Sequence, residues 1–121
     1  MPLRQVGDGL LCAAPPAWAA GLFAAVARSW VEHGRSGAPR NVGQVNVALG
    51  PEAVVADART AMADYYAFTG DASRMTAGLR TTRAAVRDTI SAFADRGADE
   101  VVLYCWATDP TQLDRLAHLT A

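Results

Sequence analysis

The last third of the chain, Ile90–Leu119, constrains the fold more than any other segment. It begins with the end of an amphipathic helical pattern, which stops at Gly97. The apolar run Glu100–Cys105 follows and has the length of a buried strand. After Asp109 a second helical pattern, Pro110–Leu119, closes the chain with proline at its first position. A strand between two helices is the repeating unit of a parallel sheet, so the sequence predicts a fold of the α/β class.

Two more strand–helix pairs precede this unit. The apolar segment Gly9–Ala13 is predicted to be a strand, and the helix Ala17–His33 follows it. Four large apolar residues recur in this helix at four-residue spacing and are expected to form one buried stripe: Trp18, Leu22, Val26 and Trp30. The segment Asn41–Leu49 is the next predicted strand, with alternate residues on its two faces. Gln44 and Asn46 fall on the same face, which is unusual for a strand that is covered on both sides.

Three helices are expected between the second and third strands. They are Glu52–Phe68, a short helix from the N-cap Asp71 to Ala77, and a helix that begins at Thr81 or Thr82 and ends at Arg96. The predicted order is therefore β-α-β-α-α-α-β-α, with about three parallel strands and four to five helices. Parallel strands of this kind are joined by right-handed crossovers.

The length of 121 residues fits a single domain, 1–121. A closed (β/α)8 barrel needs roughly 250 residues, so at most part of such a barrel is present. The net charge of −1 and the absence of a basic stripe speak against a nucleic-acid partner. The longest apolar run, Ala17–Ala27, is too short to cross a membrane, and no secretory signal is recognised, so a cytoplasmic protein is expected. Cys12 and Cys105 lie in no cluster with zinc-ligand spacing, and no metal site is predicted.

Several of these segments resemble luciferase-like, flavin- or deazaflavin-dependent monooxygenases. The stretches ADRGADEVVL and DPTQLDRLA in the last third are similar to the final strand and helix of that family. Gly7–Leu10 resembles an earlier family strand that leads into a helix started by proline. Gln44–Leu49 resembles the seventh strand of the family's barrel, and Glu100–Cys105 resembles the eighth. The resemblance implies a partial (β/α)-barrel-like unit, a truncated luciferase-like segment.

The resemblance leaves out the half of the family that carries most of its chemistry. The early strands, which hold much of the flavin pocket and the usual catalytic residue, have no counterpart, and Leu79–Thr82 stands where the family has a GTPE turn. The resemblance therefore implies a small accessory or partner subunit of a two-component flavin-dependent monooxygenase, which supplies or mimics the C-terminal barrel strands. FMN or a deazaflavin would bind only together with a partner chain, which is either a larger luciferase-like subunit or a second copy of this chain. Enzymatic activity of the chain alone is not expected.

Three alternatives stay open beside this interpretation. The first is a non-catalytic homodimer that binds a flavin or a small apolar ligand between its subunits. The second is a degenerate or truncated gene product without a function of its own. The third is an unrelated small α/β enzyme that uses Cys105. Independently of these alternatives, the open edges of a three-stranded parallel sheet favour a partner, either another copy or a larger luciferase-like subunit.

The candidate cofactor-binding residues lie at or near the ends of the predicted strands, because barrel active sites lie at the C-terminal ends of strands. Tyr104 and Trp106 could stack on a flavin ring or line an acyl pocket. Gln44 and Asn46 could point into a barrel interior or bond to a polar group of a partner. Ordinary packing is the alternative for all four, and Asp109 is expected to cap the last helix. No catalytic residue is assigned.

The remaining reactive side chains are interpreted as structural. Cys12 and Cys105 are predicted to be buried thiols, because neither has a histidine near it in the sequence. His33 is expected to cap the C-terminus of its helix, and His118 is expected to be exposed. Four arginines are expected on a solvated helix face, with a phosphate or an acidic partner as the alternative: Arg74, Arg80, Arg83 and Arg87.

Overall fold

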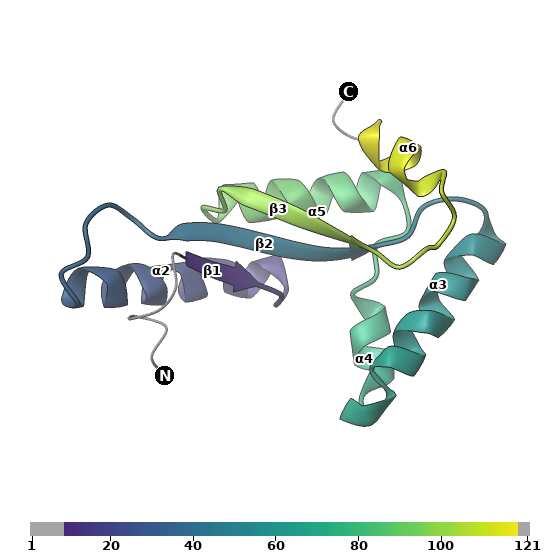
Figure 1. Cartoon of the computed structure of the whole chain (residues 1–121), viewed down its shortest axis with the longest axis horizontal. Helices are drawn as coiled ribbons and strands as arrows, with labels where there is room; N and C mark the ends of the chain where they lie inside the picture. The colour runs from purple at the N-terminus through teal and green to yellow at the C-terminus, as the bar shows by residue number, and fades with distance from the viewer. Residues whose placement is uncertain (1–8, 119–121) are drawn as a thin grey trace. The chain divides into compact units, whose positions relative to one another are not determined.

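The computed structural model describes residues 9–118, in which strands and helices alternate along the chain (Figure 1). The strands are β1 (Gly9–Cys12), β2 (Arg40–Val47) and β3 (Glu100–Cys105). The helices are α2 (Pro16–Glu32), α3 (Glu52–Tyr65), α4 (Ala72–Ala77), α5 (Arg83–Asp95) and α6 (Gln112–Ala117), and the 3-10 turn η1 (Ala67–Thr69) separates α3 from α4. None of the helices within residues 9–118 has the length and apolarity that a membrane span requires. The predicted α/β class and the predicted order of elements are confirmed.

The three strands form one parallel sheet in the order β1-β2-β3. β1 pairs with the first half of β2 in the parallel sense. β3 follows β2 in the same direction, since Asp99 N–H donates to the Asn41 carbonyl at 2.7 Å and Trp106 N–H donates to the Val47 carbonyl at 3.0 Å. β2 is therefore the central strand, and the prediction of a partial β/α unit with three parallel strands is confirmed.

Polar contacts tie the starts of β2 and β3 together. Asn41 N–H donates to the Asp99 carboxylate at 2.9 Å, and the Asn41 side-chain amide donates to the Gly97 carbonyl at 3.1 Å. Arg40 and Glu100 add an ion pair of 3.0 Å, but both side chains are more than half exposed, so this pair contributes little. Gly97 has a φ of 97°, which residues with a side chain rarely adopt. Glycine at this position thus permits the sharp turn from α5 into β3.

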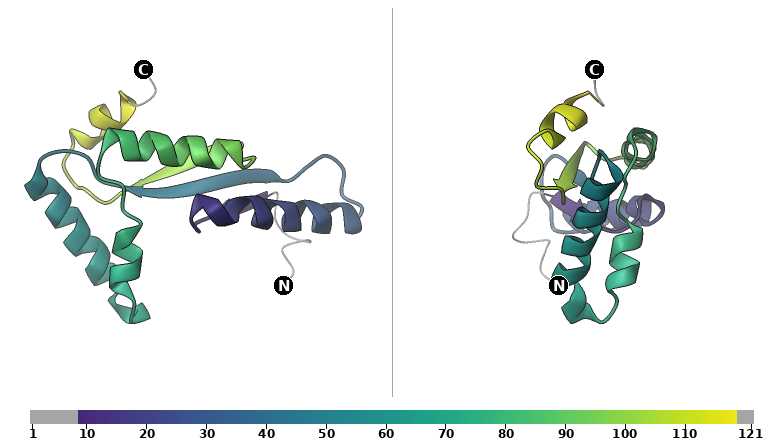
Figure 2. Two further views of the ribbon diagram at one scale, coloured as in Figure 1. Left: turned by 180° about the vertical axis from the view of Figure 1, so that it is seen from behind. Right: turned by 90° about the vertical axis from the view of Figure 1, so that its right-hand side faces the viewer.

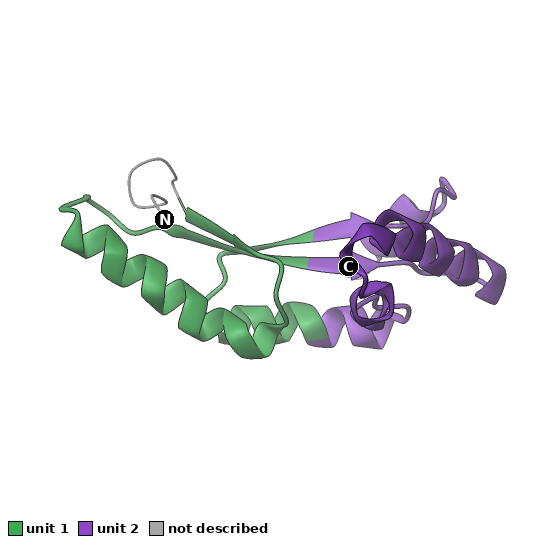
Figure 3. Ribbon diagram, turned by 90° about the horizontal axis from the view of Figure 1, so that it is seen from below, with its two compact units in different colours: residues 1–44, 89–102 green, residues 45–88, 103–121 purple. Residues whose placement is uncertain are grey.

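The chain divides into two compact units, which Figure 3 shows in different colours. Unit 1 comprises residues 1–44 and 89–102, and unit 2 comprises residues 45–88 and 103–121. Both β2 and β3 contribute residues to each unit. Each unit buries its own set of apolar side chains.

In unit 1, α2 and the C-terminal part of α5 lie on the same face of the sheet (Figures 2 and 3). The buried residues of α2 are Ala19, Phe23 and Trp30. Phe93 of α5 is 1% exposed and lies against Gly43 of β2, where an added Cβ would be 2.6 Å from the ring. The close approach of this ring explains why β2 carries a glycine in its middle.

The opposite face of the sheet in unit 1 has no helix over it within the described residues (Figure 2). Leu11 of β1 is in register with Val42 of β2, so the two side chains share this face. Leu11 is 52% exposed, and Val42 and Gln44 are half-buried, whereas Gly43 on the helix-covered face is buried. A polar Gln44 in the middle of β2 is accommodated because its face is open to solvent.

The prediction of one buried apolar stripe along α2 is wrong for the N-terminal half of the helix. Trp18 is 58% and Leu22 41% exposed, while Val26 is half-buried and Trp30 is buried. A helix has 3.6 residues per turn, so each four-residue step moves a side chain about 40° around the axis. Three such steps turn the line of side chains by about 120°, from an exposed flank at Trp18 to the buried face at Trp30.

Unit 2 forms its core beside the end of β2. The buried residues are Ala48, Ala58, Met62 and Leu79, and Tyr66, Met75, Trp106 and Ala107 pack against them. The segment that precedes α5 pairs with β2: Arg80 N–H donates to the Asn46 carbonyl at 2.9 Å, and Ala48 N–H donates to the Arg80 carbonyl at 3.0 Å. This short parallel bridge fixes the chain between α4 and α5 against the central strand.

The long helix α3 ends earlier than predicted, at Tyr65 rather than Phe68. The chain tightens there into η1, and the Thr69 hydroxyl donates to the Tyr66 carbonyl at 2.7 Å. Gly70 follows with a φ of 74°, a left-handed conformation that ends the turn. Phe68 is left 82% exposed at this point.

Of the three helix caps predicted at Asp71, Thr82 and His33, two make the expected contacts and one does not. Asp71 occupies the N-cap of α4 but makes no capping hydrogen bond with its side chain. Thr82 is confirmed as the start of α5, since its hydroxyl oxygen accepts the N–H of Ala85 at 3.1 Å. His33 is confirmed as the C-cap of α2, with its Nδ1 lying 2.8 Å from the Ser29 carbonyl oxygen.

The packing of Phe93 on β2 predicts that alanine substitutions at two glycines change the stability in opposite directions. Gly43→Ala should lower the free energy of unfolding by about 1–3 kcal/mol, because the new methyl group overlaps the buried ring. Gly21→Ala is the matched control: its Cβ would meet nothing within 4 Å. On the exposed side of α2 this change should raise the free energy of unfolding by up to about 1 kcal/mol. Urea denaturation measures both variants, and equal midpoints for the two would contradict the described packing.

Candidate functional site

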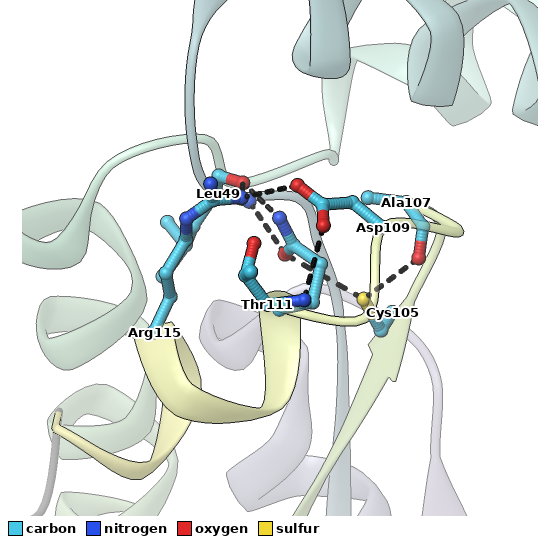
Figure 4. Close-up of polar contacts among 7 residues, drawn as sticks. Leu49, Cys105, Ala107, Asp109, Thr111 and Arg115 are labelled. Atoms are coloured by element: carbon cyan, nitrogen blue, oxygen red, sulfur yellow. Dashed lines mark hydrogen bonds and ion pairs between the residues drawn. The ribbon is translucent and has the colours of Figure 1, made fainter.

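The ends of β2 and β3 in unit 2 are the place where a barrel-like fold would put functional residues. α6 and the loop before it lie here beside Leu49, which comes shortly after β2 (Figure 4). Two side chains of α6 make most of the polar contacts in this region, and both of them bond to the backbone of Leu49.

The side chain of Gln112 holds the backbone of Leu49. Gln112 is 2% exposed, and its Oε1 accepts the N–H of Leu49 at 3.0 Å. Its Nε2 donates to the carbonyl of the same residue. One amide thus satisfies both backbone groups of a buried residue, as a neighbouring strand would do.

Arg115 and Asp109 form a partly buried ion pair in the same region. Arg115 Nη1 donates to Asp109 Oδ2 at 3.1 Å and to the Leu49 carbonyl at 3.0 Å, and the two charged side chains are 27% and 28% exposed. Thr111 N–H donates to Asp109 Oδ1 at 3.0 Å. The hydrogen bonds from Thr111, followed by the Arg115 guanidinium, hold the pKa of Asp109 below its ordinary value. Asp109 is therefore a charged anchor of the turn before α6.

This turn also explains why the last helix begins later than predicted. α6 starts at Gln112 instead of Pro110, with Thr111 at its N-cap. The Asp109 carboxylate binds the N–H of Thr111 inside the turn, so its side chain does not cap the helix itself. The predicted end at Leu119 lies outside the described residues.

Gly50 gives the Arg115 side chain room beside Leu49. Its φ is 128°, and an added Cβ would overlap the Arg115 guanidinium. A side chain at position 50 would thus be excluded both by backbone conformation and by lack of space.

The two cysteines have different environments. Cys12 is 2% exposed, and the prediction of a buried thiol is confirmed for it. The same prediction is wrong for Cys105, which is exposed at the end of the edge strand β3. Its Sγ lies 3.4 Å from the Ala107 carbonyl and 3.6 Å from Gln112 Oε1. A thiol has one proton and can donate to only one of these acceptors at a time.

Two of the predicted site residues are bonded to each other. Trp106 Nε1 donates to Asn46 Oδ1 at 2.9 Å, which satisfies the indole and the amide oxygen together. The Trp106 ring also meets Tyr65 edge-on, with 5.6 Å between ring centroids, and lies 6.0 Å from the Tyr66 ring. The Asn46–Trp106 pair therefore takes part in the packing of unit 2.

The other two predicted site residues do not join this pair through hydrogen bonds. Tyr104 is 49% exposed, and alternation along β3 places it on the same face as Trp106. Gln44 belongs to unit 1, on the uncovered face of the sheet. Its side-chain amide makes no hydrogen bond within residues 9–118, so it is available for a group outside this part of the chain.

The remaining candidates from the sequence are the histidines and the four arginines of the predicted helix face. His118 is exposed just after α6, as predicted. Of the four arginines, Arg74 pairs with Asp71 at 3.7 Å across exposed side chains, Arg83 and Arg87 are exposed, and Arg80 is half-buried. In the described part of the chain, no three His, Cys, Asp or Glu side chains are grouped so that they could hold a metal ion.

Sequence reasoning missed Gln112 and Arg115. Their three-residue spacing puts them on one side of the predicted last helix, and Gly50 after the second strand was a signal for close approach. A glutamine on an amphipathic helix gives no sign of whether it faces solvent or a buried backbone. The network that these residues form holds the chain in place, and it contains no nucleophile with an adjacent base.

Comparisons with known proteins found no match. No family model, no curated protein and no solved structure corresponds to this chain. Its function has to be inferred from the residues and their geometry.

The buried side chain of Gln112 should contribute more to stability than the exposed side chain of Leu113, its neighbour on α6. Gln112→Ala leaves the buried N–H of Leu49 without the Gln112 acceptor, at a cost of roughly 1–3 kcal/mol, while Arg115 still donates to the Leu49 carbonyl. Leu113→Ala removes a side chain that is 76% exposed and should change stability by less than about 0.5 kcal/mol. Urea denaturation of both variants is the measurement. Equal losses for the two would show that the amide does not hold Leu49.

The different exposure of the cysteines predicts stepwise labelling. In the folded protein, a thiol reagent such as Ellman's reagent should modify Cys105 at once and Cys12 only after denaturant is added. Cys105→Ser should remove the fast phase and leave the slow one. Simultaneous release of two equivalents without denaturant would contradict the burial of Cys12.

Proposed function

We propose that this chain is a small partner subunit of a two-component luciferase-like flavin-dependent monooxygenase and supplies or mimics the C-terminal strands of the barrel. The observation that carries the proposal is the uncovered sheet face of unit 1, where Leu11 is 52% exposed beside Val42. In a (β/α)8 barrel, helices cover the outer face of the strands, and side chains from all strands fill the interior. Strands with helices on one face only have the arrangement of a barrel segment whose interior-filling neighbours are missing.

The edges of the sheet support an association of this type. β1 and β3 are the outer strands, and within residues 9–118 no further strand pairs with the outer side of β3. An edge strand of six residues presents free N–H and carbonyl groups, which a strand of another chain can bind. In the proposal, strands of the larger subunit extend the sheet and cover Leu11.

The flavin, FMN or a deazaflavin, would be held mainly by the larger subunit. The residue of this chain best suited to contact a flavin ring is Tyr104, since its side chain is half exposed. Asn46 and Trp106 are bonded to each other and would support such a contact from behind. Gln44, with its free amide, would face the interior of the completed barrel. The proposal assigns no catalytic residue to this chain.

A non-catalytic homodimer that binds a flavin or a small apolar ligand is the second candidate. The exposed Tyr104 favours it, because an unpartnered aromatic ring can stack on a planar ligand. The two candidates differ in whether the isolated chain binds a flavin.

A tagged form of the chain, expressed in its native host, tests the leading proposal by co-purification and mass spectrometry. The expected result is recovery of a luciferase-like monooxygenase chain in a fixed ratio. Leu11→Arg, on the open sheet face, should abolish that recovery. Val31→Arg should retain it, because Val31 is 76% exposed on α2, away from the sheet. Equal recovery with both variants would refute the role of the sheet face.

Titration of FMN into the isolated chain separates the two candidates. The leading proposal expects no quenching of flavin fluorescence by the chain alone. Saturable quenching that Tyr104→Ala removes would instead support the ligand-binding homodimer.

A further inference from the structure

The exposed side of α2 is apolar where a surface helix normally carries charges. From Pro16 to Ala27 no side chain is charged, and the indole of Trp18 is the only one that can form a hydrogen bond. Ala19 and Phe23 point into unit 1, but Trp18 remains 58% exposed. This part of α2 therefore presents a second apolar surface, on the side that the sheet does not cover.

Four residues define this surface, which we call the α2 face: Trp18, Gly21, Leu22 and Ala25. Trp18 and Leu22 are four residues apart, and so are Gly21 and Ala25, so the helical period places them in two adjacent rows on one side of the helix. Leu22 is 41% exposed, Ala25 is exposed, and no atom lies within 4 Å of a Cβ built at Gly21. The α2 face is thus a bulky ridge beside a shallow, open strip.

We propose that the α2 face binds the α2 face of a second copy, with the two helices antiparallel across a two-fold axis. The bulky Trp18 lies in the N-terminal half of the face, and the small Ala25 lies in the C-terminal half. An antiparallel pair places each Trp18 over the Ala25 of the other helix. A parallel pair would set Trp18 against its own copy and leave a gap between the alanines.

Arg28 adds a charged contact to this pairing. It is exposed one turn beyond Ala25, and within residues 9–118 it has no ion-pair or hydrogen-bond partner. In the antiparallel pair its guanidinium reaches the tryptophan at the start of the opposite helix, as a cation–π contact. Unit 1 already contains one contact of this kind, since the Arg35 guanidinium lies 3.7 Å from the centroid of Trp30.

The exposed area sets the expected strength of the dimer. An aromatic side chain offers about 150–250 Å², of which Trp18 leaves more than half exposed. With Leu22 and the small residues, each copy contributes roughly a few hundred Å², whereas a stable interface buries about 800 Å² per partner. A weak dimer that depends on concentration is therefore expected. It does not rest on the proposed function, because it uses a helix surface and not the sheet face around Leu11.

Sedimentation equilibrium over protein concentrations from about 1 μM to 1 mM tests the pairing. The wild-type chain should shift from monomer to dimer in this range. Gly21→Glu should weaken the dimer at least about tenfold, because it buries a carboxylate against apolar residues. The same variant should raise the urea midpoint, since glycine is a poor helix former, which separates loss of pairing from loss of folding.

Ala20→Glu is the matched control, because Ala20 is exposed on the same helix but two residues from both Trp18 and Leu22. It should leave the dissociation constant within about twofold of the wild-type value. A wild-type chain that stays monomeric throughout, or a Gly21→Glu chain that pairs like the wild type, would overturn the proposal.

Cysteine cross-linking tests the orientation of the helices in a Cys105→Ser background. Gly21→Cys lies near the proposed two-fold axis and should form a disulfide-linked dimer on mild oxidation. Ser29→Cys lies near the end of α2, far from its own copy in an antiparallel pair, and should not cross-link. Cross-linking of Ser29→Cys, with or without cross-linking of Gly21→Cys, would mean parallel helices and would overturn the antiparallel arrangement.

Discussion

The backbone hydrogen bonds of β2 are the interaction on which the rest of the structure depends. On one side, β3 bonds to the carbonyls of Asn41 and Val47. On the other side, β1 pairs with the first half of the strand, and the segment at Arg80 takes over at its end. Just beyond the strand, the amide of Gln112 substitutes for a neighbouring strand at Leu49. Because buried backbone groups must be paired, this series of partners fixes where each helix can leave the sheet.

The side chains of β2 decide which of its faces is covered. Gly43 admits the Phe93 ring on one face in unit 1, and the polar Gln44 lies half-buried on the other face. The chain is 51% hydrophobic, and the largest side chains that are less than 2% exposed within residues 9–118 are Phe93, Met62, Val47 and Val86. Much of the remaining apolar content is alanine, which buries little area per residue. A core of this kind gains stability when another surface covers the residues that the chain leaves exposed.

The sequence was sufficient to predict the elements that have clear ends. The strand Glu100–Cys105 was placed to the residue, because Gly97 precedes an uninterrupted apolar run. Periodicity was less informative for α2, since a four-residue spacing drifts around the helix and Trp18 emerges on the exposed side. The burial of Gln112 could not be predicted, because it depends on a tertiary contact with Leu49. Cys105 was misplaced for a related reason: an edge strand looks like a buried strand until its neighbours are known.

The open sheet face and the α2 face point to two associations that do not compete. In unit 1 the helices lie on one side of the sheet, and Leu11 lies on the other. A partner strand at an edge gains backbone hydrogen bonds as well as apolar contact, whereas two α2 helices gain side-chain contacts over a small area. Binding of a larger subunit should therefore be the tighter of the two. If the larger subunits of two such complexes also bind each other, that contact raises the effective concentration for the α2 pairing, and weak helix pairing becomes sufficient to hold the assembly.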